Sequence, residues 1–252
     1  MTRRRILVTG SSRGIGRAVA EAFAAAGEIV AIHHRDSAGL AAGVLAGLPG
    51  DGHIVVQGDI ADPPAVRIFV DSAAEQLGGL DVLVNNAASY GRRGQPVGEI
   101  SYDQWQQVWQ ATIGLNLIGA ANVTWCAVQH MISAGGGQIV NVSSRGAFRG
   151  EPGQPAYGAS KAGLNALGQS LAVALAPHNI TVAAVAPGFV QTDMAAAHLQ
   201  GEGGEAIRAQ SPFGRVATPA EVAAAVVYLA SPAARWASGA ILDLNGASYL
   251  RT

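Results

Sequence analysis

Tyr157 and Lys161 are the pair in this chain whose types and spacing point most directly to chemistry. Residues four apart on a helix share a face, so the ammonium of Lys161 would stand one turn from the phenol of Tyr157. A phenol has a pKa of about 10 and is a poor base at neutral pH, but a nearby positive charge favours the phenolate. The pair could therefore take a proton from an alcohol, or give one to a ketone, near neutral pH.

Lysine usage singles out the same position. Lys161 is the only lysine in the chain, whereas there are fifteen arginines. Arginine and lysine differ in shape, in hydration and in how readily their pKa shifts. Because this chain uses arginine for its other positive charges, we interpret Lys161 as a position that arginine cannot fill.

A glycine-rich turn, residues 9–16 (TGSSRGIG), follows a short apolar run and opens an Ala-rich helical pattern. Glycines in such a turn allow the backbone to approach a ligand closely, and the helix N-terminus that follows attracts a pyrophosphate. A glycine turn is a weak signal alone, but its place between a strand and a helix predicts a dinucleotide site.

Apolar runs and helical patterns alternate along the whole chain. The runs do not alternate with polar residues, as expected for parallel strands that are covered on both faces. The predicted strands are Ile6–Val8, Ile29–His33, Ile54–Gln57, Val82–Val84, Gln138–Val142, Thr181–Val185 and Ala240–Leu242. The predicted helices are Gly16–Ala26, Ser37–Leu48, Pro63–Leu77, Tyr102–Ser133, Pro155–Ala176 and Pro219–Ala230. This order predicts a doubly wound α/β fold of the Rossmann type with a parallel sheet, forming a single domain over residues 1–252.

One segment, Gln191–Gly214, interrupts this alternation with three glycines inside a weak helical pattern. A loose segment late in such a fold could act as a lid over the site. An ordinary surface loop explains the composition equally well.

With these motifs in place, the chain resembles the short-chain dehydrogenase/reductase family over nearly its whole length. The TGxxxGxG turn and the YxxxK at Tyr157 carry the resemblance, together with the NNAA of residues 85–88, the Pro187-Gly188 pair and the Asn245-Gly246 ending. Within the family it is most similar to the 3-oxoacyl-carrier-protein reductase branch. Two positions depart from the family pattern, because Ala88 and Ala247 stand where glycines are usual.

The resemblance implies a catalytic tetrad in which Asn116 and Ser144 join Tyr157 and Lys161. Ser144, rather than Ser143, has the family's spacing to the tyrosine, and its hydroxyl would stabilise charge on the substrate oxygen. Asn116 matches the helix asparagine that holds a relay water beside the lysine. The implied cofactor-binding residues are Gly10, Ser12, Arg13, Gly14, Ile15, Gly16, His34, Arg35, Asp59, Ile60, Asn86, Ala87, Tyr157, Lys161, Pro187, Gly188, Val190 and Thr192.

Residues near the end of the second strand bear on which nucleotide binds. A ribose 2′-phosphate favours cations, whereas a free 2′-hydroxyl favours a carboxylate. His34 stands at the position where NAD-preferring relatives have an acidic residue, and Arg35 follows His34 directly. A second arginine, Arg13, lies in the glycine turn, where NADP-preferring relatives have a basic residue. The alternative is that Asp36, about 20 residues beyond Gly16, is that acid. Two arginines against one aspartate favour NADP(H), and we predict it as the cofactor.

Composition limits the partners. Charged residues make up 13% of the chain and the formal net charge is −1, which offers no electrostatic basis for binding nucleic acid or an anionic membrane. The basic run Arg3–Arg5 is interpreted as a solvated terminus. The lone cysteine, Cys126, is expected to be buried, and no Cys/His cluster has metal-ligand spacing. With neither a signal peptide nor an uninterrupted apolar run of bilayer length, we expect a cytoplasmic protein.

These observations predict an oxidoreductase that transfers a hydride between NADP(H) and a ketone or secondary alcohol. The alternatives are a 3-oxoacyl-carrier-protein reductase proper, and a nucleotide-sensing binding module without catalysis, which the intact tetrad disfavours. The resemblance also implies a homotetramer formed through the helices Tyr102–Ser133 and Pro155–Ala176.

Substrate-side arginines suggest a small molecule with an anionic group. Arg145 and Arg149 follow Ser144, Arg92 and Arg93 follow the NNAA motif, and a guanidinium could clamp a carboxylate or phosphate. The competing interpretation is that all four are solvated loop arginines. The segments expected beside the active-site mouth, Met131–Gly137 and Pro177–Asn179, contain no Arg or Lys that could dock an acidic carrier protein.

Overall fold

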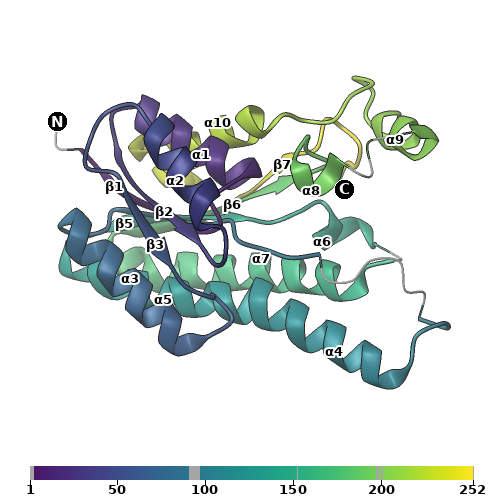
Figure 1. Cartoon of the computed structure of the whole chain (residues 1–252), viewed down its shortest axis with the longest axis horizontal. Helices are drawn as coiled ribbons and strands as arrows, with labels where there is room; N and C mark the ends of the chain where they lie inside the picture. Colours follow the sequence, from purple (N-terminus) through teal and green to yellow (C-terminus); the bar gives the residue numbers. More distant parts are fainter. Residues whose placement is uncertain (1–2, 91–96, 152, 197–198, 200, 252) are drawn as a thin grey trace.

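A parallel sheet of seven strands forms the centre of the molecule (Figure 1). The computed structural model describes residues 3–90, 97–151, 153–196, 199 and 201–251. The strands are β1 (Arg5–Val8), β2 (Ile29–His34), β3 (Ile54–Gln57), β4 (Val82–Asn85), β5 (Gly137–Val142), β6 (Ile180–Pro187) and β7 (Ile241–Leu244). Their order in the sheet is β3-β2-β1-β4-β5-β6-β7, which confirms the doubly wound α/β prediction.

β1 lies at the point where the order of the strands reverses. Leu7 of β1 is opposite Ala31 of β2 on one side and Leu83 of β4 on the other. Ligands of open α/β sheets bind outside the carboxyl ends of the strands at such a switch point, because the loops there diverge. The loops after β1, β2 and β4 are therefore the ones that the fold places around a ligand.

Helices cover both faces of the sheet, as Figure 1 shows. On one face lie α1 (Gly14–Ala25), α2 (Ala38–Gly47) and α10 (Pro219–Leu229), with Phe23 and Val226 fully buried between helix and sheet. On the other lie α3 (Pro63–Leu77), α4 (Tyr102–Ile113), α5 (Ala120–Ser133) and α7 (Pro155–Leu175), with Phe69 and Met131 buried. The non-alternating strand sequences follow from this two-sided burial.

The predicted helix Tyr102–Ser133 is continuous but not uniform. Residues Gly114–Gly119 between α4 and α5 form a π-helical segment, which the sequence prediction missed. A π-segment inserts an extra residue into a helical turn and is frequent at functional sites. Here it contains Asn116, whose side chain is 1% exposed.

The described residues of the segment Gln191–Gly214 include two helices, α8 (Asp193–Ala196) and α9 (Gly201–Arg208), where the sequence shows only a weak helical pattern. The choice between a lid and an ordinary surface loop stays a prediction. A third short helix, α6 (Gly146–Arg149), follows β5 and was also not predicted. Of the three, α6 packs against α7 (Pro155–Leu175).

The termini of the predicted elements shift by a few residues. β2 includes His34, and β6 extends to Pro187 at its carboxyl end. α10 begins as its sequence predicts, since the Thr218 side chain accepts from the backbone N–H of Glu221 and the Glu221 side chain bonds back to Thr218.

The basic run at the N-terminus does not form the solvated end that was expected. Arg3, Arg4 and Arg5 form ion pairs with Asp51, Glu28 and Asp81 respectively. Arg5 also donates to the carbonyl oxygen of Gly78. Because these partners lie in the loops around β1, the run fastens the first strand to its neighbours.

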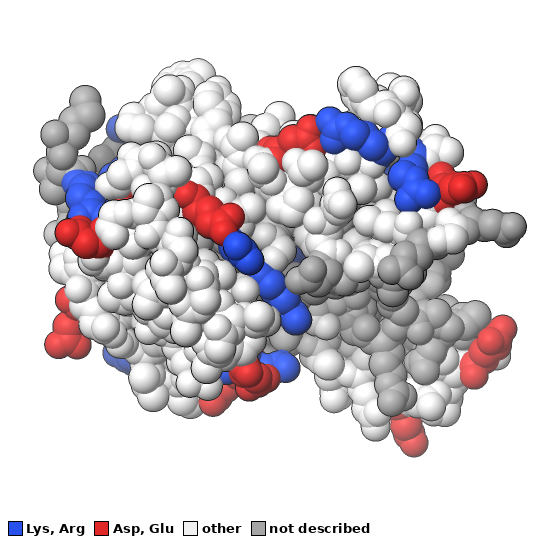
Figure 2. Space-filling view, turned by 45° about the horizontal axis from the view of Figure 1, so that its top comes forward, with Lys and Arg blue, Asp and Glu red and all other residues white. Residues whose placement is uncertain are grey.

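Positive and negative side chains are mixed on the face of the molecule that Figure 2 shows. Blue and red residues are scattered or side by side there, without a continuous field of one sign.

The helix Tyr102–Ser133 is long and apolar enough to cross a membrane, contrary to the sequence expectation, but half of its most apolar stretch is buried. It packs against α3 and α7, so its apolar residues belong to the core. Cys126 is buried there, as predicted.

Candidate active site

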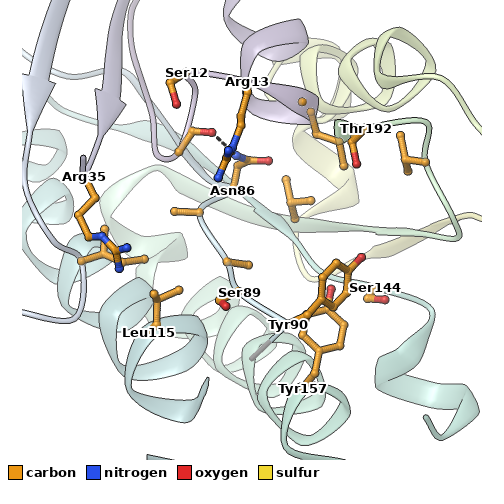
Figure 3. A pocket seen from close by; sticks show the side chains of 18 of the residues that line it. Ser12, Arg13, Arg35, Asn86, Ser89, Tyr90, Leu115, Ser144, Tyr157 and Thr192 are labelled. Atoms are coloured by element: carbon orange, nitrogen blue, oxygen red, sulfur yellow. Dashed lines mark hydrogen bonds between the residues drawn. The ribbon is translucent and has the colours of Figure 1, made fainter. Parts of the chain in front are cut away.

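A cleft of about 720 Å³ opens at the carboxyl ends of β1, β2, β4, β5 and β6. Every predicted cofactor-binding residue except Gly16 lines it, together with Ser144. Figure 3 shows Arg35 on one side of the view and Tyr157, Tyr90 and Ser144 on the other, with Ser12, Arg13 and Asn86 between them. The sequence therefore identified one continuous site, with a basic end and an end that bears hydroxyl groups.

The turn after β1 is shaped for close backbone approach. Gly10 and Gly14 have φ angles of 64° and 58°, a region that favours glycine. Gly16 lies behind the turn, where an added Cβ would collide with the carbonyl oxygen of Gly10 and approach the Asn86 amide nitrogen to 2.5 Å. The Asn86 side chain donates to the carbonyl oxygens of Thr9, at 2.8 Å, and Gly10, at 3.0 Å. The turn is thus fixed from behind, and the N-terminus of α1 faces the cleft.

His33, which the sequence analysis did not select, supports the same turn from β2. Its Nδ1 accepts from the backbone N–H of Gly10 at 3.1 Å, so Nε2 carries the proton and donates to the Gly58 carbonyl oxygen at 3.0 Å. The ring packs against Phe69 at a centroid distance of 4.4 Å. Burial lowers the pKa of His33 to about 4, so the ring is neutral at physiological pH.

Arg35 and Asp36 form the edge of the cleft beyond β2. The guanidinium of Arg35 donates to the Asp36 carboxylate at 2.5 Å, and a second carboxylate, that of Asp59, lies 3.8 Å from it. Both Arg35 and Asp36 line the cleft. The arginine that would favour NADP(H) and the aspartate that would favour NAD(H) are therefore paired with each other.

Tyr157 is buried at the other end, beside two hydroxyl groups. Ser144 and Tyr90 line the cleft with it, and the two tyrosine rings are 4.5 Å apart between centroids. Burial raises the pKa of Tyr157 well above its usual value, the charge and hydrogen bond of Tyr90 raise it further, and the Ser144 hydrogen bond lowers it. Ser143 instead bonds to the backbone oxygen of Lys161, which favours Ser144 as the hydroxyl that meets a substrate.

Lys161 lies one turn along α7 from Tyr157, as the spacing predicted. Its Nζ is 5.8 Å from the centroid of the Tyr157 ring and donates to the Val142 carbonyl oxygen at 2.8 Å. Burial lowers the pKa of Lys161 to about 8. The group can therefore change its protonation near neutral pH, as an ordinary surface lysine cannot.

Asn116 does not line the cleft, although it belongs to the predicted tetrad. Its side chain clamps the backbone of Ser89, accepting from the N–H and donating to the C=O, each at 2.8 Å. It also donates to the Ser160 hydroxyl at 3.1 Å, and that hydroxyl donates to the Tyr157 carbonyl oxygen. The asparagine thus joins the loop after β4 to the helix that carries the catalytic candidates.

Neither Arg145 nor Arg149 lines the cleft, where the sequence suggested a clamp for an anionic group. Arg145 is buried and does not line the cleft; its guanidinium donates to the side-chain oxygens of Ser248 and Gln210, both at 2.6 Å. Arg149 donates to the same Gln210 oxygen at 2.8 Å. These two arginines fasten α6 to the segment after α9 and to the C-terminal residues. Arg92 and Arg93 lie outside the described residues.

Comparisons with known proteins agree with this geometry. A family model described as enoyl-(acyl carrier protein) reductase matches residues 10–246. The 3-oxoacyl-acyl-carrier-protein reductase of Staphylococcus aureus is 37% identical over 246 residues, 97% of each chain. The cis-4-hydroxycyclohexanecarboxylate dehydrogenase of Sinomonas cyclohexanicum is 39% identical over 242 residues, 95% of this chain and 94% of its own. The crystal structure of a short-chain dehydrogenase from Burkholderia cenocepacia in complex with NADP matches with a TM-score of 0.87 and 38% identity over 97% of both chains.

The chain belongs to the short-chain dehydrogenase/reductase family. The family resemblance inferred from the motifs is therefore confirmed, and the protein is an NAD(P)-dependent oxidoreductase. Within the described ranges, no three His, Cys, Asp or Glu side chains gather where they could hold a metal ion.

The cleft of this short-chain dehydrogenase/reductase fits a nicotinamide nucleotide. Two residues that line it, His34 and Thr112, each carry a buried side-chain atom, Nδ1 and Oγ1 respectively, that has no hydrogen-bond partner among the described residues. Buried polar groups are nearly always paired, so a ligand with donors and acceptors is expected at these positions. The glycine turn provides the close backbone approach and the helix N-terminus that a pyrophosphate requires.

Two functional candidates escaped the sequence analysis. Tyr90 follows the Asn85-Asn86 motif closely enough to share its loop, and this could have identified it. His33 is next to His34 at the carboxyl end of the same strand, and both residues line the cleft. Arg145 was misassigned because its partners are 65 and 103 residues distant in sequence.

Proposed function

We propose that this protein is an NADP(H)-dependent carbonyl reductase, reversible as an alcohol dehydrogenase, that acts through Ser144, Tyr157, Lys161 and Asn116. One observation carries the proposal: the buried Tyr157 and Ser144 line the same nucleotide-sized cleft, with the ammonium of Lys161 one helical turn from the phenol. A phenol and a hydroxyl that face one point can hold the oxygen of a carbonyl group.

The nicotinamide supplies a hydride to the carbonyl carbon when bound, or removes one from the alcohol carbon in the reverse direction. The chain's own residues handle the oxygen and the proton. Ser144 donates a hydrogen bond to the carbonyl oxygen, which holds it beside Tyr157 and stabilises its developing charge. Tyr157 then donates its proton to that oxygen, completing the alcohol. Lys161, in its ammonium form, stabilises the phenolate that remains.

Asn116 acts from a distance in this scheme. Its side chain orients Ser89 and Ser160, and through them the loop and the helix on either side of Tyr157. A role in holding a relay water beside Lys161 is compatible with its burial, and we keep it as part of the proposal.

NADP(H) is proposed over NAD(H) because Arg35 and Arg13 both line the cleft. A 2′-phosphate offers a dianion with which Arg35 could replace its pairing to Asp36. The NADP-bound relative of known structure supports this choice. Steady-state kcat/KM with NADPH and NADH tests it, with Arg35→Ala expected to weaken NADPH and to leave NADH nearly unchanged. A preference for NADH would assign the ribose to Asp36 instead.

For the substrate we propose a small ketone or secondary alcohol. The similarity to a dehydrogenase named for a hydroxycyclohexanecarboxylate supports this class. The carboxylate clamp proposed from Arg145 is dropped, since that side chain is already bonded to Ser248 and Gln210. A 3-oxoacyl-carrier-protein reductase is the second candidate, favoured by the 37% identity to such an enzyme.

A panel of ketones tests the proposal directly. NADPH consumption is measured with cyclic, acyclic and carboxylate-bearing ketones and with a carrier-bound 3-oxoacyl chain. The proposal predicts turnover of at least one free ketone above the rate for the carrier thioester. Higher kcat/KM for the thioester would establish the second candidate. Nucleotide binding without turnover of any compound would indicate a sensing module instead.

A homotetramer remains our proposal for the assembly. Apolar side chains stand exposed on the two long helices, including Ile118 and Trp125 on the helix Tyr102–Ser133 and Val173 on α7. Exposed apolar groups on neighbouring helices are typical of subunit contacts. Light scattering of the purified protein gives its mass and tests this. The cytoplasmic location expected from the sequence stays a prediction.

A further inference from the structure

The short helix α6 is in direct contact with the Ser144 hydroxyl. Ser144 Oγ accepts a hydrogen bond from the backbone N–H of Gly146, the first residue of α6, at 3.0 Å. A serine hydroxyl has one proton to donate and two acceptor positions, so this contact leaves its proton for another group. α6 has only four residues, too few to keep a helical position alone. The place of the Ser144 hydroxyl therefore depends on what holds α6.

α6 also packs closely against the helix that carries Tyr157. Gly158 of α7, the residue after Tyr157, lies so near that an added Cβ would stand 3.1 Å from the Gly146 carbonyl oxygen. Figure 3 shows Ser144 and Tyr157 on the same side of the cleft. Because α6 touches both the serine hydroxyl and this helix, a displacement of α6 would change where the hydroxyl stands relative to the phenol.

The C-terminal strap, residues 248–251, lies against α6. The Tyr249 hydroxyl donates to the Phe148 carbonyl oxygen at 3.4 Å. The Arg251 guanidinium lies over the ring of the same phenylalanine, 4.2 Å from the ring centroid. A guanidinium over an aromatic face is attracted by the ring and covers its apolar surface. Phe148 is thus held through both its backbone and its side chain.

The strap is itself anchored to the sheet. Arg251 Nε forms an ion pair with the Asp243 carboxylate of β7 at 2.7 Å, and the same guanidinium donates to the Ile241 carbonyl oxygen at 2.8 Å. The Asn245 side chain bonds both backbone groups of Tyr249, at 2.9 and 3.3 Å. Since β7 is hydrogen-bonded to β6, Arg251 connects α6 to the central sheet.

We propose that Arg251 is a positioning residue, which holds α6 through Phe148 and thereby keeps the Ser144 hydroxyl where the carbonyl oxygen of the substrate binds. This inference rests on the proposed function, in which Ser144 donates to that oxygen. Arg251 does not line the cleft, so it acts on the reaction through α6 and not by touching nucleotide or substrate there.

Arg251→Ala removes both the contact with the Phe148 ring and the anchor to β7. We expect kcat for ketone reduction to fall by about 3- to 30-fold, a part of the about 10²- to 10³-fold cost of losing such a donor entirely. NADPH affinity should not change, because the strap does not line the cleft. Arg251→Lys keeps a cation for Asp243 and should recover part of the lost kcat. Arg235→Ala, at an exposed arginine, is the matched control and should change neither quantity.

Combining Arg251→Ala with Ser144→Ala shows whether the arginine acts through the serine. If it does, Arg251→Ala should lower kcat when Ser144 is present and have no further effect in Ser144→Ala, which has already lost the hydroxyl. A general loss of structure would lower kcat by the same factor in both backgrounds. That result, or an unchanged kcat in Arg251→Ala, would overturn the proposal.

A second measurement does not depend on turnover. Amide hydrogen exchange of the peptide that spans residues 144–150 reports on the Gly146 N–H and the other amides of α6. We expect faster exchange there in Arg251→Ala, and unchanged exchange in the peptide of α2, Ala38–Gly47. Wild-type exchange in residues 144–150 would mean that the strap does not hold α6, and would contradict the proposal. If Ser144→Ala keeps wild-type turnover, the proposed role of Ser144 fails, while the exchange data still decide whether Arg251 holds α6.

Discussion

Burial controls the charge of the residues at the two ends of the cleft. Lys161 has its pKa lowered to about 8 and His33 to about 4, each mainly by burial. The pKa of Tyr157 is raised for the same reason. Desolvation opposes whichever form is charged, so a cationic group and a phenol shift in opposite directions. The protein thereby holds a neutral phenol next to a lysine that titrates close to neutral pH.

His33 makes stability depend on pH in a defined window. Its pKa is lowered in the folded protein, so its contribution to stability is complete above the unfolded pKa of about 6.5 and is lost as the pH falls toward 4. The difference corresponds to about 3 kcal/mol in the free energy of unfolding. We expect urea unfolding to show this loss between those pH values in the wild type.

The comparison that isolates this effect uses His33→Gln. The variant is expected to be less stable at neutral pH, because the Gly10 N–H loses its acceptor, and to lose much of the pH dependence in that window. His178→Gln, an exposed site, serves as the control. If the free energy of unfolding depended on pH in the same way in His33→Gln and in the wild type, the dependence would belong to other titratable groups.

Ala247 is strained where the family has glycine. Its φ angle is 57°, in the left-handed region, where a Cβ costs about 1–2 kcal/mol. Ala247→Gly is therefore expected to raise the free energy of unfolding by about 0.5–1 kcal/mol, after the entropic cost of glycine is subtracted. Ala42→Gly, exposed within α2, should destabilise by a similar amount. Destabilisation by both changes would show that the φ at Ala247 carries no strain.

At the scale of elements, the turn between β1 and α1 depends on Gly16 even though that residue does not line the cleft. An added Cβ would meet the Gly10 carbonyl oxygen and the Asn86 amide, and the Gly10 backbone could not give way without disturbing the turn. Gly16→Ala is expected to weaken NADPH binding by at least about 10-fold, as measured by calorimetry without any substrate.

Gly43 offers a control for that substitution. It lies within α2 with no neighbouring atom near the place of an added Cβ. Gly43→Ala should leave NADPH affinity unchanged and stabilise the protein by roughly 0.5–1 kcal/mol. Wild-type NADPH affinity in Gly16→Ala would mean that the turn does not form the phosphate cradle.

For the whole molecule, the features that could be predicted from the sequence were the repeated alternation of strands and helices and the motifs formed by residues close in sequence. The alternation of apolar runs and helices predicts the doubly wound sheet, and the TGxxxGxG and YxxxK motifs indicate the two ends of one cleft. Packing over long sequence distances could not be predicted. Arg145 reaches Gln210 and Ser248 and thus leaves the substrate side, and Asn116 bonds to Ser89 and to Ser160, which are 27 and 44 residues away in sequence. The π-segment that contains Asn116 was likewise not predicted.

The measurement that tests the account most directly is ketone reduction by Tyr157→Phe, with NADPH affinity measured on the same sample. The ring remains and only the transferable proton is lost. We predict that kcat falls by at least about 10²-fold while NADPH still binds. Near-wild-type turnover in Tyr157→Phe would contradict the assignment of Tyr157 as the proton donor.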